Sequence, residues 1–305
     1  MSVPPGPRRV LATDRCEAWR MRAIRLHPPG GIDGLALDDV ETPSPRPGEA
    51  LVRVHAAAIT RDELTWPVDR LPAIPSYELA GVVAAVAPDV ESVAVGDACF
   101  ALTPFDRNGV AAEYAAVPAD LLAPEPRPLD HVASAAIPLP ALSAWQGLFE
   151  HGALKEGERV VITGAMGGVG HLATQLARWR GAKVIAAAAT EDARPVDLVF
   201  DTAGGDVLRE AMTIVRDGGR LVSVAEPAAT ETAEIDASFF VVEPNRSQLL
   251  EITRLVEAGD LQPAIDSVFP LTEGKAAFRR SMERGKRGKV VLRVMDEAVD
   301  DEPAG

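Results

Sequence analysis

A glycine-rich segment near the middle of the chain carries the clearest chemical signal. It follows an apolar run at residues 159–163 and precedes Leu172, Leu176 and Trp179, which are spaced as on one helix face, so the stretch predicts a strand, a tight turn and a helix. Glycine lacks Cβ and therefore lets a phosphate approach the free N–H groups at a helix N-terminus. The pattern predicts a dinucleotide-binding loop made of Gly164, Ala165, Met166, Gly167, Gly168, Val169 and Gly170. The alternative is a glycine-rich turn that serves only close packing.

Composition limits the classes of protein to which the chain can belong. Its 305 residues suit two domains, and 47% hydrophobic residues allow sizeable cores. The formal charge of −14 argues against a nucleic-acid or anionic-membrane surface, because such surfaces need clustered Lys and Arg. Cys16 and Cys99 are the only cysteines, too few for a disulfide framework or a four-thiolate zinc site. No apolar run approaches a membrane span of ~18 residues, so we expect a soluble cytoplasmic protein.

The first half of the chain has the texture of a compact β domain. Residues 1–20 are rich in proline and predict a tail. The strands expected after it are short and separated by turns, which is typical of a barrel-like domain. They cover residues 21–27, 35–40, 49–59, 79–86, 94–100 and 109–117.

Strands and helices alternate after residue 129, which predicts an α/β domain with a doubly wound parallel sheet. The expected strands are 159–163, 183–188, 197–202 and 220–224, and the expected helices are 130–139, 143–151, 168–180, 207–215 and 243–258. A helix at 272–284 and a strand at 289–294 precede an acidic tail, residues 296–305. We predict a substrate domain formed by residues 21–138 and 269–295 and a nucleotide-binding domain formed by residues 139–268.

Several motifs together give the chain a resemblance to a known family. They are Val52-Arg-Val-His-Ala-Ala-Ala-Ile-Thr-Arg-Asp62, Ile74-Pro-Ser-Tyr-Glu-Leu-Ala-Gly-Val-Val83, Leu142-Ser-Ala-Trp-Gln-Gly-Leu148, the glycine loop, Asp201-Thr-Ala-Gly-Gly205 and Gly285-Lys-Arg-Gly-Lys-Val290. From Met21 to about Val294 the chain resembles the medium-chain dehydrogenase/reductase superfamily, within it the zinc-free quinone oxidoreductase (zeta-crystallin-like) branch. The resemblance implies a GroES-like substrate domain, a Rossmann-type domain, and an NADP(H)-dependent transfer of hydride to a quinone, an enone or another α,β-unsaturated carbonyl.

The resemblance also bears on zinc. Zinc-dependent relatives carry a Cys early in the substrate domain, a His-Glu pair in the segment that matches Ser76-Tyr77-Glu78, and a thiolate near the interdomain connection. Here no Cys stands at the first place, Tyr77 replaces the His, and Pro140-Ala141 occupies the third. We therefore expect no metal site and no Lewis-acid alcohol chemistry.

Two residues are candidates for assisting the reaction. Thr60 matches a position where quinone oxidoreductases often carry an Asn beside the nicotinamide, although it equally suits a strand-end residue that caps its own loop. Tyr77 is expected to point its phenol toward the cleft and to steady an enolate oxygen, or else to fill the space of the lost ligand. Both are assigned as catalytic, and Thr60 also as cofactor-binding.

Charged and cofactor-contacting residues complete the expected site. We expect Glu78 in a structural ion pair, His55 packed on its strand, and Asp62 and Glu63 as an exposed loop pair. Lys289 is assigned to the cofactor site, with a solvated position in the basic run 284–289 as the alternative. Further cofactor contacts are predicted at Thr190, Arg194, Thr202, Ala225, Phe240 and Val241.

One segment is shorter than the resemblance implies. Only residues 189–195 separate the expected strand 184–188 from the strand that begins at Asp197, whereas a parallel crossover usually takes a dozen or more residues. We expect the sheet to lack an outer strand and its helix, leaving an edge shielded by a partner chain, as in a possible homodimer, or by residues 1–20. Glu191 and Asp192 disfavour a 2′-phosphate and Arg194 favours one, so NAD(H) is also possible. The alternative function is a scaffold with a crippled cofactor pocket that acts as a binding protein or non-redox enzyme.

Overall fold

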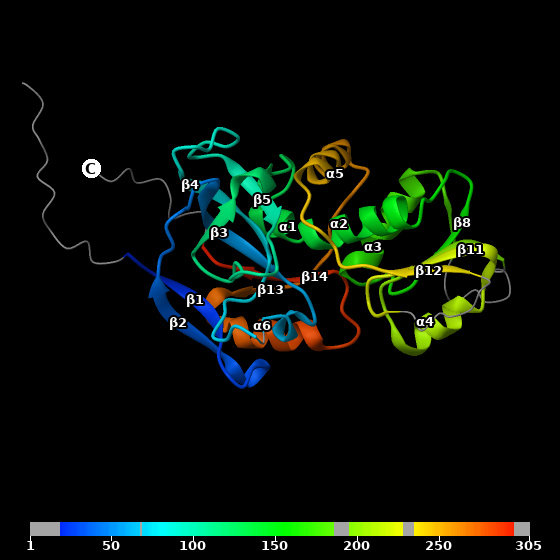
Figure 1. Cartoon of the computed structure of the whole chain (residues 1–305), viewed down its shortest axis with the longest axis horizontal. Coiled ribbons are helices and arrows are strands. Elements are labelled where there is room, and N and C mark those ends of the chain that lie inside the picture. The colour runs from blue at the N-terminus through cyan, green and yellow to red at the C-terminus, as the bar shows by residue number, and fades with distance from the viewer. Residues whose placement is uncertain (1–18, 68, 186–194, 228–234, 296–305) are drawn as a thin grey trace, which may run out of the picture.

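The molecule has two lobes side by side along its long axis (Figure 1). The structure, a computed structural model, describes residues 19–67, 69–185, 195–227 and 235–295. Residues 1–18 of the predicted N-terminal tail, the C-terminal tail, residues 189–194 of the short crossover, and with them the predicted cofactor contacts Thr190 and Arg194, lie outside these residues. The end of the predicted N-terminal tail is wrong, because Arg20 already belongs to a strand. One lobe is the predicted substrate domain, and the other holds the parallel sheet.

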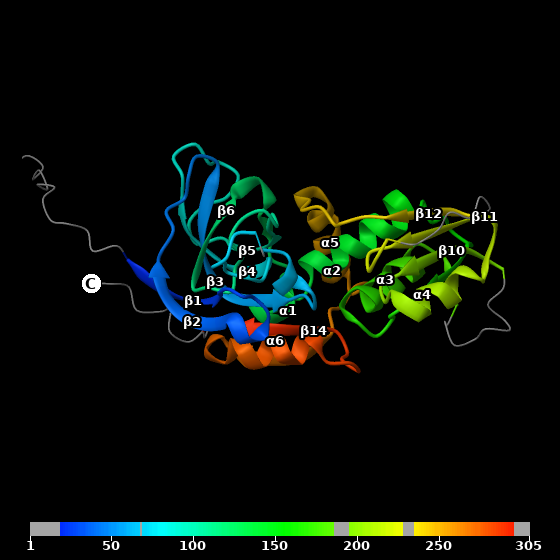
Figure 2. The same cartoon turned by 60° about the horizontal axis from the view of Figure 1, so that its bottom comes forward.

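The substrate domain is built from a hairpin and a seven-stranded sheet. β1 (Arg20–Leu26) pairs with β2 (Leu35–Glu41). The main sheet follows the order β13-β14-β3-β4-β5-β7, with β6 also on β3. Its strands are β3 (Glu49–Ile59), β4 (Glu78–Val86), β5 (Ala98–Leu102), β6 (Tyr114–Pro118), β7 (Ala123–Pro124), β13 (Ile265–Pro270) and β14 (Lys289–Arg293). The sheet therefore combines strands from both ends of the chain. Its C-terminal part begins with β13 at Ile265, before residue 269, where the second part of the substrate domain was predicted to begin. α6 (Gly274–Met282) packs against it (Figure 2).

Helices join the two lobes. α1 (His131–Ala135) and α2 (Pro138–Trp145) lead into a π-helical turn (Gln146–His151), and α2 packs against α3 (Gly168–Trp179) and α5 (Arg246–Ala258). Pro138 stands at the start of α2, where its missing N–H costs no hydrogen bond. One continuous apolar core runs from Phe100 in the substrate domain to Phe200 in the parallel sheet. The two lobes are thus firmly connected.

The second sheet is parallel and has five strands in the described residues, in the order β12-β11-β10-β8-β9. These are β8 (Arg159–Ile162), β9 (Lys183–Ile185), β10 (Val196–Asp201), β11 (Val215–Ser223) and β12 (Asp236–Phe239). β8 lies between β9 and β10. The expected shortened, doubly wound sheet is therefore confirmed, and β9 forms its edge in the described residues.

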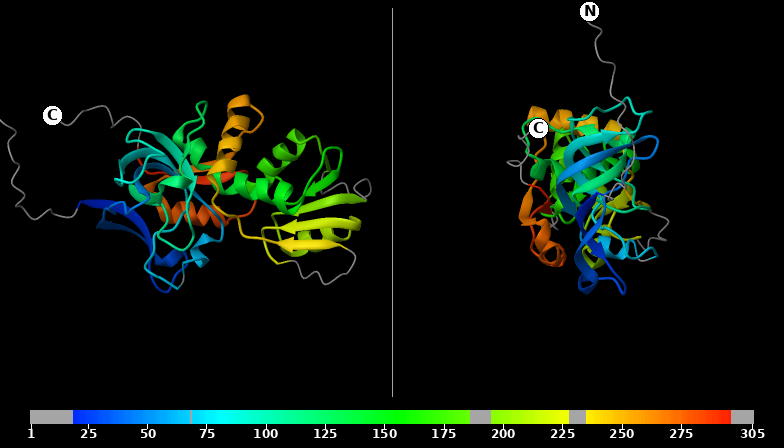
Figure 3. Two further views of the ribbon diagram at one scale, coloured as in Figure 1. Left: turned by 45° about the horizontal axis from the view of Figure 1, so that its top comes forward. Right: turned by 90° about the vertical axis from the view of Figure 1, so that its left-hand side faces the viewer.

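Side chains alternate between the two faces of this sheet, as strand geometry requires. Val160, Ile162 and Phe200 point to the core shared with α2, α3 and α5. Val161 and Val199 point to a smaller core with α4 (Gly205–Met212). Helices thus cover both faces (Figure 3). In the run β8-α3-β9 the helix lies on one face, and in the run β10-α4-β11 it lies on the other, so the sheet is doubly wound.

Several expected boundaries are wrong. Strand β5 begins at Ala98 rather than residue 94, and β6 begins at Tyr114 rather than residue 109. Helix α5 begins at Arg246 rather than residue 243, because Asn245 caps it by accepting a 3.0 Å hydrogen bond from Gln248 N. Strands β12 and β13 were not predicted, since none of their residues is fully buried and they lack a continuous apolar signal.

Candidate functional site

The predicted cofactor contacts meet at one edge of the parallel sheet. The glycine loop follows β8, Thr202 follows β10, Ala225 lies beyond β11, and Phe240 and Val241 follow β12. Because parallel strands end at the same edge, these segments lie side by side at the carboxyl edge of the sheet. Nucleotides bind at this edge in sheets of this kind.

Close backbone contacts explain the glycines. Gly164 has φ 61°, and a Cβ there would lie 2.5 Å from Thr202 Oγ1. A Cβ on Gly170 would lie 2.2 Å from Gly164 O, which no side chain tolerates. Gly167 precedes α3 as its N-cap, and no side chain caps the helix N-terminus with a hydrogen bond. The loop therefore leaves open the N–H groups that a diphosphate needs.

A buried hydrogen-bond network holds the strand ends in register. Asp201 is fully buried and accepts from Thr163 Oγ1 at 2.6 Å and Ser223 Oγ at 2.7 Å. Thr202 donates through Oγ1 to Thr163 O at 2.7 Å, and Ala225 N donates to Ser223 Oγ at 3.2 Å. Thr202 and Ala225 are thus tied to this network through Thr163 and Ser223, respectively.

The segment after β12 is fixed by Gln146. Its amide donates to Glu243 O at 2.9 Å and accepts from Glu243 N at 3.0 Å, as a neighbouring strand would. Phe240 is buried and stacks on His151 at 4.2 Å between ring centroids, whereas Val241 is 62% exposed. Of the two predicted contacts, Val241 is the one that presents an accessible side chain.

The substrate domain reaches the glycine loop through the start of β14. Gly288 N donates to Met166 O at 3.0 Å, and Gly167 and Gly288 form a parallel bridge. The Lys289 stem crosses the helix N-terminus, where a Cβ on Gly168 would lie 2.8 Å from Lys289 Cδ. The predicted site residues of the two domains are therefore neighbours.

The buried side chains of Lys289 and Glu78 form a cluster at this junction with the partly buried Thr60. Lys289 Nζ donates to Thr60 Oγ1 at 2.9 Å and forms an ion pair with Glu78, while Thr60 Oγ1 donates to Glu78 Oε1 at 3.2 Å. Burial raises the pKa of the Glu78 carboxyl, and the Lys289 ammonium opposes that rise. The expected ion pair of Glu78 is confirmed. The solvated alternative for Lys289 is wrong, because the residue is only 5% exposed.

Glu63 lies behind this cluster, and its expected exposure is wrong. The 3-10 turn Glu63–Thr65 leaves Asp62 exposed and turns Glu63 inward, to 1% exposure. Its Oε2 accepts from Thr60 N at 3.0 Å. Burial raises the pKa of Glu63 to about 8, against the opposing effects of the Thr60 N–H and the Lys289 charge.

Tyr77 lies in an aromatic group with Trp66 and Phe105, at 5.6 and 5.2 Å between ring centroids. It is fully buried, and its hydroxyl accepts from Arg70 Nη2 at 3.2 Å. Burial raises the pKa of its phenol, with Arg70 opposing. This burial favours the space-filling alternative over contact with an enolate, and the catalytic role of Tyr77 stays a prediction.

Two histidines have structural positions. His55 is buried as expected and stacks on His131 at 4.3 Å between ring centroids. His171 accepts from Ala264 N through Nε2 at 2.9 Å, so its Nδ1 carries the proton donated to Gly167 O at 2.8 Å. Burial lowers its pKa, in agreement with a neutral ring that connects the glycine loop to the residue that precedes β13.

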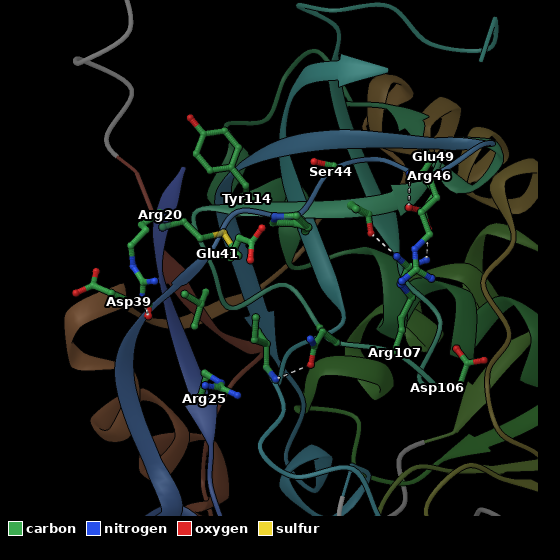
Figure 4. Close-up of a pocket in the computed structure, with 18 residues that line it drawn as sticks. Arg20, Arg25, Asp39, Glu41, Ser44, Arg46, Glu49, Asp106, Arg107 and Tyr114 are labelled. Atoms are coloured by element: carbon green, nitrogen blue, oxygen red, sulfur yellow. Dashed lines mark hydrogen bonds and ion pairs between the residues drawn. The ribbon is translucent and has the colours of Figure 1, made fainter. Parts of the chain in front are cut away.

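A separate pocket of about 830 Å³ lies on the substrate domain, between the β1–β2 hairpin and β6. Figure 4 shows its lining, in which Arg107 pairs with Glu49 at 2.9 Å. Arginines and carboxylates alternate around it, and none of the predicted site residues lines it. The pocket therefore does not belong to the junction described above.

Comparisons with known proteins agree with this architecture. Residues 175–292 match a family described as zinc-binding dehydrogenase, and residues 46–127 match the alcohol dehydrogenase GroES-like domain. A probable zinc-binding oxidoreductase, mitochondrial, of Arthroderma benhamiae is 33% identical over 86% of this chain and 93% of its own length. The chain belongs to the medium-chain dehydrogenase/reductase superfamily. It is an oxidoreductase.

Two further proteins are similar to the chain, one in sequence and one in structure. The NADPH-dependent alkenal/one oxidoreductase, chloroplastic, of Arabidopsis thaliana is 29% identical over 86% of this chain and 77% of its own length. The quinone oxidoreductase structure from Coxiella burnetii superposes with a TM-score of 0.83 at 27% identity, covering 91% of this chain and all of that one. In the part of this chain that the structure describes, no helix is long and apolar enough to cross a membrane.

In the present chain, the residues at the positions where zinc-dependent relatives carry their metal ligands do not fit zinc. Tyr77 offers a phenol that Arg70 already holds, and Pro140 and Ala141 lie within α2 without a donor side chain. Within the described residues no group of three or more His, Cys, Asp or Glu side chains is placed to hold a metal. Zinc therefore enters no step derived below.

Sequence reasoning missed Glu63, Gln146 and His171. Gln146 lies within a predicted motif, and Glu63 and His171 directly follow one. The roles of Gln146 and His171 depend on contacts with distant segments, at residue 243 and residue 264. The signal available for His171 was its place in the first turn of the helix after the glycine loop. For Glu63, no signal distinguished it from its exposed neighbour Asp62.

Proposed function

We propose that this protein is a zinc-independent, NAD(P)H-dependent reductase of quinones, enones or other α,β-unsaturated carbonyls. The observation that carries the proposal is the junction itself, where the open glycine loop lies against Lys289, Thr60 and Glu78 of the substrate domain. The names of the alkenal/one oxidoreductase and quinone oxidoreductase relatives support the substrate class.

The residues at the junction suit a dinucleotide. Gly164, Gly167, Gly168 and Gly170 leave room for a diphosphate at the start of α3, and Thr202 and Val241 lie along the same edge. When bound, a reduced nicotinamide supplies the hydride. We propose NADP(H) as the cofactor and keep NAD(H) as the second possibility, because the segment with Thr190 and Arg194 lies outside the described residues.

The substrate domain provides polar hydrogens near the loop. Lys289 carries buried N–H donors that Glu78 and the partly buried Thr60 hydroxyl hold in place. Donors fixed in a dry site stabilise charge that moves onto a carbonyl oxygen during reduction, and they need no reorganisation. Reduction of an activated double bond requires such a donor and a proton, but no Lewis acid, which agrees with the missing zinc ligands.

Partners and location are further predictions. We propose a small-molecule substrate, no nucleic-acid or membrane partner, a cytoplasmic location and a homodimer. The edge strand β9 is the place where a second chain would shield the sheet, and size-exclusion chromatography with light scattering tests for it.

Quenching of tryptophan fluorescence by NADPH and NADH tests the function. We expect saturable binding of one cofactor at micromolar concentration. Gly168→Asp should abolish it, because its side chain collides with Lys289 and repels a phosphate. Arg178→Asp, which adds the same residue at the exposed far end of α3, is the matched control and should bind normally. Lack of binding of either cofactor up to millimolar concentration would favour the alternative function, a binding protein or non-redox enzyme whose cofactor pocket no longer works.

A further inference from the structure

Two buried carboxyl groups share one cation beside the glycine loop. Glu63 and Glu78 are each 1% exposed, and the charged groups that act most strongly on Glu63 are Lys289 and Glu78. Lys289 is already paired with Glu78. One ammonium can offset one carboxylate, and a second uncompensated charge in a buried site is strongly unfavourable. Electroneutrality of the cluster therefore requires one additional proton.

Geometry places that proton on Glu63. Glu78 receives hydrogen bonds from Lys289, Thr60 and Leu139 N, the last at 3.0 Å, so both of its oxygens are engaged as a carboxylate. Glu63 accepts from Thr60 N, the Ser76 N–H acts on it only weakly, and its buried Oε1 accepts no hydrogen bond of good geometry. A carboxyl group with one oxygen unengaged is better suited to the protonated form.

Glu63 also determines where Thr60 lies. Thr60 N donates to Glu63 Oε2 at 3.0 Å, and Glu63 N donates to Thr60 O at 3.3 Å. This reciprocal pair closes the turn after β3. The side chain of Thr60 then meets Lys289 Nζ at 2.9 Å. The backbone of Thr60 thus depends on Glu63, and its hydroxyl depends on Lys289.

We propose that Glu63 is a positioning residue that must carry a proton for Thr60 and Lys289 to keep their places in the site. An ionised Glu63 competes with Glu78 for the Lys289 ammonium and draws it from the Thr60 hydroxyl. Lys289 and Glu78 face Glu63 from β14 and β4, and the Tyr77 phenol, also on β4, interacts with it. The inference rests on the proposed reductase function.

The expected consequence is a single ionisation in the pH profile. The raised pKa of Glu63, about 8, keeps the proton at neutral pH. Above it, kcat/KM for enone reduction should fall about tenfold per pH unit, as for any activity that requires one proton to be retained. Glu63→Gln keeps an oxygen for Thr60 N and cannot ionise, so its profile should stay level through this range.

The experiment measures kcat/KM against pH for the wild type, Glu63→Gln, and Asp62→Asn as the exposed neighbouring control. Loss of the break in Glu63→Gln alone supports the proposal, whereas a break that persists in Glu63→Gln, as from Lys286 or Tyr77, overturns it. Urea unfolding against pH is measured in parallel, since it needs no catalysis. Wild-type stability should decline between about pH 5 and pH 8 relative to Glu63→Gln, because the unfolded chain loses this proton near the ordinary glutamate pKa of 4.5. If no acceptor is reduced, the proposed function fails, and equal pH slopes for the two proteins would overturn the role of Glu63 independently.

Discussion

Replacing Lys289 by Met should destabilise the fold in a strongly pH-dependent way. The ammonium is buried between Thr60 and Glu78, and the variant keeps a stem of similar length against Gly168. Removing one partner of a buried ion pair typically costs about 3–5 kcal/mol, because the other charge is left uncompensated. Glu78 would retain only the hydrogen bonds from Leu139 N and Thr60 Oγ1.

The magnitude is limited by protonation of Glu78. Because an ordinary glutamate has a pKa of 4.5, placing a proton on this carboxyl costs about 1.4 kcal/mol for each pH unit above that value, so the loss at pH 7 is about 3 kcal/mol. At about pH 5.5 it should be near 1–2 kcal/mol, since the proton is then easily supplied. The sign is that of a raised pKa: the native variant binds a proton that the unfolded chain releases above its own pKa. Its stability therefore falls as pH rises.

Urea unfolding of wild type and variant at the two pH values measures this difference. Because the Lys289 charge also lowers the pKa of Glu63, both proteins carry Glu63→Gln in this comparison. Lys289→Met combined with Glu78→Gln should regain most of the loss at neutral pH. Lys275→Met, which removes a half-exposed pair with Asp33, should change stability by less than about 1 kcal/mol. A loss that is equal at both pH values would refute the buried-pair reasoning.

Two further substitutions test the supports of the cofactor edge. A buried neutral His with a lowered pKa binds fewer protons than the unfolded chain, so wild-type stability falls as the pH decreases below about 6.5. His171→Asn should remove part of this loss. An unchanged slope of unfolding free energy against pH in urea would contradict a neutral His171 bonded to Gly167. Asp201→Asn should lower the free energy of unfolding by about 2–4 kcal/mol, since an amide presents a donor to the donating hydroxyls of Thr163 and Ser223. It should also weaken cofactor binding, and calorimetry measures both effects. A stability loss below about 1 kcal/mol would mean that this network does not hold the strand ends.

The elements nearest the glycine loop could be predicted from residue types. Apolar β-branched residues before Gly164 and helical spacing after Gly170 are local signals, and the short interval between Lys183 and Asp197 correctly predicted a sheet without its outer strand in the described residues. Strands β12 and β13 escaped because they are stabilised by pairing with β11 and β14, which a local pattern does not show.

The site could be predicted only in part for the same reason. Lys289 was assigned near the cofactor, but its burial follows from Glu78, which lies 211 residues away. The neighbouring acids Asp62 and Glu63 have similar side chains, and only the 3-10 turn decides which one points inward. Long-range pairing of charges is a property of the fold and leaves no periodic trace in the chain.

Transfer of deuterium from NADPH labelled at the transferable C4 position tests the central claim most directly. The protein is incubated with the labelled cofactor and an enone or quinone acceptor, and the product is analysed by mass spectrometry. The account predicts one deuterium at the enone β-carbon with wild-type protein and Arg178→Asp, and none with Gly168→Asp. Cofactor binding without transfer to any unsaturated carbonyl or quinone would contradict it.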